Sequence, residues 1–328
     1  MNKFEKGIFT ISLDFELYWG MRDKKNLEDY LDNLLGVNTV VNELLDAFRE
    51  YNIHTTWAIV GFLFFDDMED LKNNLPSNQP NYRNTKLNPY IYIDENSKLD
   101  NRCHFAPLLI DRIMQYSDQE IATHTFSHYY CLESGQVKDE FYSDINQAIK
   151  ITKRRTGNNV YSLVFPRNQW NKDYLSVLRE LGIACYRGNP KSWIYNAVNE
   201  EGNLFRARAI RLLDAYVNIS GHNTYSLHDL MSSEPLNIPS SRFLRPISNK
   251  LSIFEIVRLN RILKSMTHAA KNKQLFHLWW HPHNFGGDVS GNMIFLRKIF
   301  EHYKKLNHKY DMCSLNMKEL SNLIKSAK

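Results

Sequence analysis

Two histidines four residues apart close a short apolar segment near the middle of the chain, which reads Glu120-Ile121-Ala122-Thr123-His124-Thr125-Phe126-Ser127-His128. On a helical turn, side chains with this spacing lie on one face, so His124 and His128 are expected to bind one metal ion together. Zinc sites commonly combine two histidines with a carboxylate and leave one position open for water. A bare His-x-x-x-His pair is common, however, and could equally cap or solvate a polar turn. The other polar clusters of the chain decide between these two interpretations.

Polar side chains also follow the other apolar segments. Residues 8–13 are predicted to form a buried strand, and the i, i+2 spacing of Asp14 and Glu16 points both carboxylates to one side of it. Carboxylates are rarely buried without partners, so the pair indicates a site; the alternative is that one caps the next element while the other faces solvent. Three further predicted strands, 160–165, 183–186 and 275–280, run into Pro166-Arg167-Asn168-Gln169-Trp170, Arg187-Gly188-Asn189 and His281-Pro282-His283.

Strands and helices alternate along the chain, which predicts a parallel sheet. Apolar residues at helical spacing predict helices over 33–50, 106–116, 137–156, 174–181, 253–272, 293–305 and 317–327, and a further strand over 53–61. In parallel α/β folds, sites lie at the carboxyl ends of the strands, where every polar cluster of this chain falls. We expect one domain over 1–328, with a loop insertion at about 66–102 and an irregular segment at about 199–246.

Composition narrows the class of protein. The 41 basic and 36 acidic residues give a net charge of +5, without a dense basic run, so a nucleic-acid partner is only weakly indicated. The cysteines are too far apart for a zinc ribbon and suggest no disulfide framework. The amino-terminal residues form no apolar segment of signal-peptide length, and no run is long enough to span a membrane. These features predict a soluble cytoplasmic protein.

The strand-end motifs together resemble the polysaccharide deacetylase superfamily, also called the NodB-homology or carbohydrate esterase family 4 group, over most of the chain. His124-Thr125-Phe126-Ser127-His128 fits the family's His-[Ser/Thr]-x-x-His motif in full, and Asp14-Phe15-Glu16 is similar to the carboxylate pair of its Asp-x-Asp/Glu branch. Trp279-Trp280-His281-Pro282 resembles the last strand with its catalytic histidine. Phe165-Pro166-Arg167 resembles the motif that supplies an arginine, although the order of Arg and Pro is inverted. The family's motif with a Trp and an Asp is matched only loosely, by Tyr186-Arg187 and Trp193.

The resemblance implies an incomplete (β/α)7 barrel and a set of catalytic roles. Glu16, His124 and His128 would hold a divalent metal ion, expected to be Zn²⁺. Asp14 would act as the base, Arg167 would pair with Asp14, and His281 would protonate the leaving amine. His283 is a competitor for the acid role, but Pro282 is expected to turn the chain and carry His283 outward.

The implied reaction is removal of an N-acetyl or similar acyl group from an amino sugar or sugar precursor in surface polysaccharide biosynthesis. The substrate-binding candidates lie at or after the ends of the predicted strands 160–165 and 183–186. They are Trp170, Tyr186, Arg187 and Trp193. A cytoplasmic location favours a nucleotide- or lipid-linked carbohydrate, whose phosphate could meet some of the arginines at 206, 208, 211, 242 and 245, although solvation explains most of these.

Three rival interpretations remain open at this point. His281-Pro282-His283 could supply a second metal pair, as in an amidohydrolase-type enzyme acting on a small amide. The chain could also be an inactive carbohydrate-binding member of the fold, although the presence of both Asp14 and His281 speaks against it. A nucleic-acid-binding role is the third.

Overall fold

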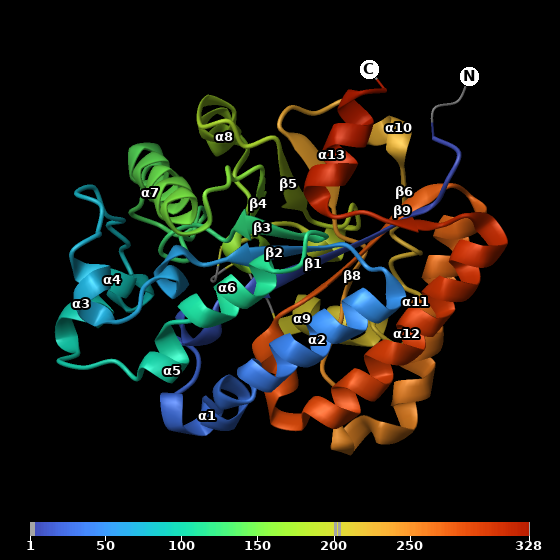
Figure 1. The fold of residues 1–328 in the computed structure, drawn as a ribbon, viewed down its shortest axis with the longest axis horizontal. Coiled ribbons are helices and arrows are strands. Elements are labelled where there is room, and N and C mark those ends of the chain that lie inside the picture. Colours follow the sequence, from blue (N-terminus) through green and yellow to red (C-terminus); the bar gives the residue numbers. More distant parts are fainter. Residues whose placement is uncertain (1–3, 200–201, 203–204, 328) are drawn as a thin grey trace.

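A barrel-shaped parallel sheet forms the centre of the molecule (Figure 1). The computed structural model describes residues 4–199, 202 and 205–327. The parallel strands lie side by side in the order β9 (Gln274–Trp280), β1 (Ile8–Phe15), β2 (Thr55–Ile59), β3 (Gln119–Thr123), β4 (Ser162–Val164), β5 (Cys185–Gly188) and β7 (Leu236–Pro239). β1 is buried along its whole length, as its β-branched and aromatic residues predict. The predicted fold class, an incomplete α/β barrel, is confirmed.

Three short strands complete the sheet, and the connection between two of its strands nearly closes the barrel. β6 (Tyr225–Ser226) pairs antiparallel with β9, β8 (Arg242–Phe243) pairs parallel with β9, and β10 (Cys313–Ser314) pairs with β1. β7 hydrogen-bonds to β5 at one edge of the sheet, and β8, only a few residues later, hydrogen-bonds to β9 at the other. Ser240 N donates to Gly188 O at 2.9 Å and Ser241 N to His277 O at 2.7 Å, so this short connection spans the gap.

The segment 199–246 is therefore more regular than expected. It contains α9 (Phe205–Asp214), β6, α10 (Leu227–Leu230), β7 and β8. Its residues 200, 201, 203 and 204 lie outside the described residues. Its strands are too short to show the alternation of apolar and polar residues that predicts a strand. Only their pairing with other strands of the sheet holds them extended.

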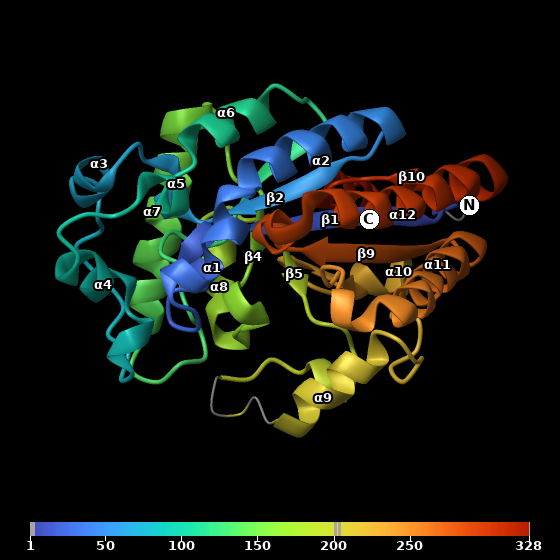
Figure 2. The same cartoon turned by 90° about the horizontal axis from the view of Figure 1, so that it is seen from below.

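Amphipathic helices cover the outside of the barrel. The predicted helices are found as α1 (Leu27–Leu35), α2 (Val37–Tyr51), α6 (Pro107–Met114), α7 (Lys138–Thr156), α8 (Leu175–Glu180), α11 (Glu255–Lys271), α12 (Val289–Tyr310) and α13 (Met317–Lys325). α2, α12 and α11 lie next to one another beside β1 and β9 (Figure 2). The helix predicted over 33–50 is instead two helices that meet at Gly36, where a Cβ would lie 2.4 Å from the Gly286 carbonyl oxygen.

The expected insertion at 66–102 carries short helices, α3 (Met68–Lys72), α4 (Pro89–Glu95) and the start of α5 (Asn101–His104). The side chains of Asp67, Asn88 and Asp100 accept hydrogen bonds from the first turns of these helices. No helix in the described part of the chain is long and apolar enough to cross a membrane.

Candidate active site

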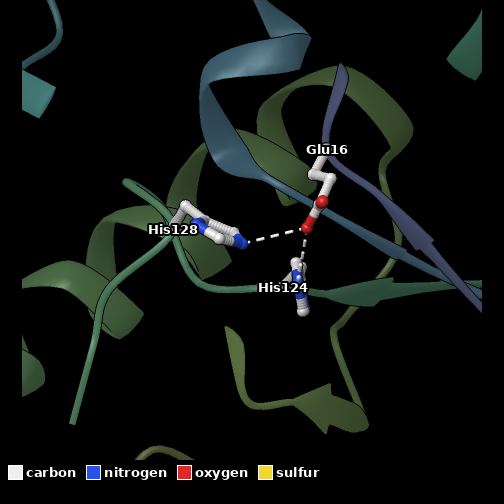
Figure 3. Close-up of side chains that lie close together, drawn as sticks. All are labelled: Glu16, His124 and His128. Atoms are coloured by element: carbon white, nitrogen blue, oxygen red, sulfur yellow. Dashed lines mark hydrogen bonds and ion pairs between the residues drawn. The ribbon is translucent and has the colours of Figure 1, made fainter. Parts of the chain in front are cut away.

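Glu16, His124 and His128 converge at the carboxyl end of the sheet (Figure 3). Glu16 directly follows β1 and His124 directly follows β3, two parallel strands separated only by β2, so both residues lie at the same edge of the sheet. The Oε2 atom of Glu16 lies 3.2 Å from His124 Nε2 and 2.9 Å from His128 Nε2. One ligand atom from each residue lies within 4.8 Å of the others, and all three residues are buried.

The two histidines do not lie on a helical turn, as their spacing predicts, but on a loop. Thr125 and His128 have positive φ angles of 66° and 59°, which a helix does not contain. Thr125 Oγ1 accepts a hydrogen bond from Tyr129 N at 2.7 Å and closes the turn. The imidazoles therefore meet because the loop folds back on itself.

Hydrogen bonds outside the cluster orient both imidazoles. His124 Nδ1 lies 2.8 Å from the Val164 carbonyl oxygen, so this nitrogen carries the proton and the lone pair of Nε2 faces Glu16. His124 Nε2 is buried without a hydrogen-bond partner within the described part of the protein. His128 Nδ1 lies 3.0 Å from the hydroxyl of Tyr130. A buried, unsatisfied imidazole nitrogen beside a carboxylate suits a divalent cation.

The protonation states also suit a cation. Burial lowers the pKa of His128 to about 4, so the imidazole is neutral at neutral pH. Burial would raise the pKa of Glu16, but the neighbouring histidines His281, His128 and His124 hold that pKa well below its usual range. Metal ligands must be deprotonated to bind, and these groups meet that condition before any ion arrives.

Asp14 is paired with Arg187, and not with Arg167 as the resemblance implies. The Arg187 guanidinium donates to both carboxylate oxygens at 2.6 and 2.8 Å, and it stacks 4.1 Å from the centre of the Trp279 ring. Burial alone would raise the pKa of Asp14, but the charge of Arg187, with smaller effects of neighbouring histidines, lowers the pKa below its usual value.

Arg167 points to a different carboxylate because of its backbone. Its φ of 55° after Pro166 belongs to a tight 3-10 turn, whereas Arg187 belongs to a strand and projects into the barrel. The Arg167 guanidinium donates to Asp23 at 2.6 Å and lies 4.3 Å from the centre of the Tyr130 ring. The predicted contact with Asp14 is therefore wrong, and Arg167 borders the metal cluster through Tyr130.

Both histidines after β9 face the carboxylates. His281 Nε2 lies 3.7 Å from Asp14 Oδ2 and 3.6 Å from Glu16 Oε1, with 21% of the side chain exposed. The expectation that Pro282 carries His283 outward is wrong: His283 is buried, packs against Tyr30, and has its Nε2 atom 3.8 Å from Glu16 Oε1. The 3-10 helix that starts at Pro282 turns the chain back toward the cluster.

The predicted substrate-binding side chains do not form one surface. Arg187 is fully buried and committed to Asp14, so that assignment is corrected. Tyr186 is buried in an aromatic cluster against Phe165, which leaves it no face for stacking on a sugar. Trp170 is half-buried against Tyr186, whereas Trp193 is 68% exposed.

A cavity of about 400 Å³ lies beside the metal cluster. Asn168, Phe243 and Trp279 line it and also contact the catalytic candidates. The Asn168 amide oxygen accepts a hydrogen bond from Arg187 at 3.0 Å, and the ring centres of Phe243 and Trp279 lie 5.7 and 5.6 Å from that of His281. The cavity thus shares Phe243 and Trp279 with the immediate surroundings of His281.

Comparison with known proteins points to one family. Residues 29–186, just under half of the chain, match the model of the polysaccharide deacetylase family. Its members are metal-dependent hydrolases that act on the amide C–N bonds of acetyl groups. The matched part of this deacetylase includes His124 and His128, whereas Asp14, Glu16 and His281 lie outside it and are brought to the histidines by the fold.

A solved structure shares the fold of this chain. A candidate polysaccharide deacetylase from Mycobacterium smegmatis superposes with a TM-score of 0.62 at 12% identity, covering 100% of this chain and 93% of that one. A mutant peptidoglycan deacetylase from Bacillus subtilis gives a TM-score of 0.42 at 10% identity, with 100% and 95% of the two chains covered. A family 4 pseudoenzyme from Bacillus anthracis gives 0.44 at 10% identity, with 97% and 66% covered. No curated protein sequence matches the chain.

Proposed function

We propose that this protein removes an N-acetyl or similar acyl group from an amino sugar by metal-dependent hydrolysis. The observation that carries the proposal is the convergence of Glu16, His124 and His128 beside the Asp14–Arg187 pair. Two imidazoles and one carboxylate are a ligand set that catalytic zinc sites use, so we propose Zn²⁺ as the metal. When bound, such an ion polarises the acyl carbonyl and lowers the pKa of a bound water.

Asp14 and His281 divide the proton transfers between them. Asp14, kept ionised by Arg187, takes a proton from the attacking water. The water oxygen bonds to the acyl carbon, the C–N bond breaks, and the leaving nitrogen takes a proton from His281. His281 suits this role because it lies next to Asp14 and 21% of its side chain is exposed. The products are a carboxylate, acetate in the simplest case, and a free amino sugar.

The proposed substrate is an N-acylated sugar precursor of a surface polysaccharide, linked to a nucleotide or a lipid. Trp170 and Trp193 are proposed to contact its sugar ring, because their side chains are partly or largely exposed and the segment around Trp193 borders the cavity. We propose that the reaction takes place in the cytoplasm, and the four cysteines, all within the described residues, are free thiols.

Replacing one metal ligand tests this function. His124→Ala should lose bound metal and acetate release from N-acetylated amino sugars, because only two of the three ligand groups remain. Metal content by atomic emission and acetate by an enzymatic assay are the measurements, with circular dichroism to verify folding. His54→Ala is the matched control, since His54 is bonded to Glu319 on the opposite, amino-terminal side of β2.

Different results would favour the rivals. A His124→Ala protein that keeps one metal ion per chain would remove the ligand assignment. Two ions per wild-type chain would favour an amidohydrolase-type site that includes His281 and His283. Stoichiometric metal and sugar binding without any acyl release would indicate an inactive carbohydrate-binding protein.

A further inference from the structure

The cavity beside the metal cluster is strongly basic. Cationic side chains recur around its wall, and no carboxylate is found among its described lining residues: the cations are Lys24, Arg167, Arg208, Arg211, Arg242 and Arg245. Some of this charge is neutralised, since Arg167 binds Asp23 and Arg242 lies 3.3 Å from Asp214. Arg208 and Arg245 form no ion pair within the described part of the chain. The cavity thus keeps an excess of positive charge.

The surroundings of Arg245 are the strongest indication of an anionic ligand. Its side chain is half-buried, and its guanidinium lies 5.9 Å from the centre of the Phe243 ring. Burial lowers the pKa of Arg245, and the like charges of Arg258 and Arg211 lower it further. Arginine forms its strongest contacts with bidentate oxyanions such as phosphate. A phosphate group in the cavity would relieve both the burial cost and the repulsion.

Arg245 and the catalytic candidates share neighbouring side chains. The same Phe243 that underlies Arg245 lies against His281, with 5.7 Å between ring centres. Trp279 lines the cavity on one side and covers Arg187, the partner of Asp14, on the other. Phe243 therefore contacts both Arg245 and His281, so a phosphate bound by Arg245 would lie near the proposed reaction site.

An exposed apolar surface continues outward from these arginines. Arg208, Arg211 and Arg245 also border a second hollow that includes Leu212. Beyond it lies an apolar rim, which we define as the exposed side chains from the end of α9 to the first turn of α11: Leu212, Leu213, Val217, Ile219, Ile253, Phe254, Ile256 and Val257. The two halves of the rim meet where Tyr216 and Phe254 lie 6.3 Å apart, and Ile253 is 83% exposed.

We propose that this deacetylase takes an amino sugar joined through phosphate to a membrane lipid. The cations of the cavity bind the phosphate, and the apolar rim rests in the membrane surface that holds the lipid. Exposed aliphatic and aromatic side chains next to arginines are the pattern by which proteins bind lipid interfaces. A nucleotide would also satisfy the cations, but it gives no reason for the apolar rim. The sugar rests on the function proposed above; the lipid phosphate rests on the cavity and the rim.

Vesicle binding by the full-length chain tests the proposal without requiring catalysis. The protein is sedimented with phosphatidylcholine vesicles that contain a polyprenyl phosphate, and with vesicles of phosphatidylcholine alone. Binding is expected only to the first. Ile253→Ser with Phe254→Ser should weaken that binding by about tenfold, because two apolar side chains leave the interface. Arg245→Ala should weaken it by about fivefold.

Matched controls come from the opposite side of the molecule. Leu108 is 79% exposed on α6, and Figure 2 shows α6 and α9 on opposite sides of the barrel. Leu108→Ser should bind the vesicles like wild type. The proposal is wrong if wild type binds neither kind of vesicle, or if the rim variant binds like wild type. Acetate release without vesicle binding would contradict only the lipid-phosphate proposal. Vesicle binding without any acyl release would contradict only the proposed function.

Discussion

Arg187 controls the protonation of Asp14, so its replacement should change the pH dependence of the reaction. Arg187→Lys keeps a positive charge but loses the planar fork that holds both carboxylate oxygens. The pKa of Asp14 should rise, and the acidic limb of the kcat/KM profile should move to higher pH by about one unit. Turnover should also fall by about 10- to 100-fold, the usual effect of removing a supporting hydrogen bond.

Arg167→Lys is the control for this variant. Its guanidinium binds Asp23, so the acidic limb should stay where it is in the wild type. If Arg167→Lys moved the limb and Arg187→Lys did not, the pairing of Asp14 described here would not govern its protonation in solution.

His281 and His283 should have separable effects. Burial lowers the pKa of His283 to about 3, so its imidazole holds no proton to donate at neutral pH. His281→Ala should therefore cost about 10²–10⁴-fold in kcat, the usual range for a positioned proton donor. His283→Gln should cost far less in kcat and mainly lower the melting temperature, because it disturbs packing against Tyr30. A severe loss of kcat in His283→Gln with an active His281→Ala would reassign the acid to His283.

At the scale of single residues, the sequence predicted the groups whose position follows from a strand end. Asp14, Glu16 and His124 lie at the ends of β1 and β3, and these parallel strands are close together because both pair with β2. The substrate-binding role predicted for Arg187 is wrong because the direction of its side chain depends on the register of β5, which periodicity in a four-residue strand does not fix. A buried carboxylate's need for a cation was the one signal that could have identified it.

At the scale of elements, α7 holds the histidine loop in place through Asp144. This buried carboxylate accepts hydrogen bonds from Phe126 N at 2.7 Å, from Ser127 N at 3.0 Å and from Ser127 Oγ at 2.5 Å. All three donors lie between His124 and His128. The loop that carries the metal ligands is thus anchored to a helix packed on the outside of the barrel, in addition to the backbone hydrogen bonds that Gly61 and Phe62 donate to Thr125 and Phe126.

Asp144→Asn should weaken the metal site without removing a ligand. The amide group replaces one acceptor oxygen by a donor, so one of the loop N–H groups loses its partner. Metal affinity should fall by about 10- to 100-fold, as for other residues that support metal ligands, and isothermal titration calorimetry would measure it. Asp139→Asn, near the amino-terminal end of the same helix, should leave the affinity unchanged. Equal affinities for Asp144→Asn and wild type would show that the loop needs no anchor.

The sequence predicts helices correctly where the apolar spacing repeats over several turns. The prediction is wrong where tertiary contacts determine the backbone conformation. α7 follows its apolar spacing and ends at Gly157, whose φ is 72°. The turn between His124 and His128 has helical spacing but no helix, because Asp144 and the positive φ at Thr125 impose another path. β6 and β8 are two residues long, and only their pairing with β9 makes them strands.

At the scale of the whole molecule, the interior of the barrel is polar and depends on uncharged histidines. His277 on β9 is fully buried, with its Nε2 atom 2.9 Å from Ser12 Oγ on β1. Arg187 donates to the same hydroxyl at 3.0 Å, so the polar contents of the barrel form one network that reaches Asp14. Burial, with the nearby charge of Arg187, lowers the pKa of His277 to about 3. The network is therefore stable only while His277 stays neutral.

This arrangement should make the metal-free protein lose stability as the pH falls below the ordinary histidine range. The unfolded chain binds protons on His128, His277 and His283 near pH 6.5, whereas the folded chain does so only near pH 4 or 3. Each such histidine lowers the unfolding free energy by about 1.4 kcal/mol per pH unit between those values. Asp144 acts in the opposite direction, because burial raises its pKa to about 6 and its contribution to the unfolding free energy is lost as the pH rises.

His277→Gln should reduce the pH slope of the unfolding free energy by about 1.4 kcal/mol per unit, measured by urea unfolding between pH 6 and pH 4.5. The exposed His308→Gln is the control, and equal slopes in the two variants would show that His277 does not limit acid stability.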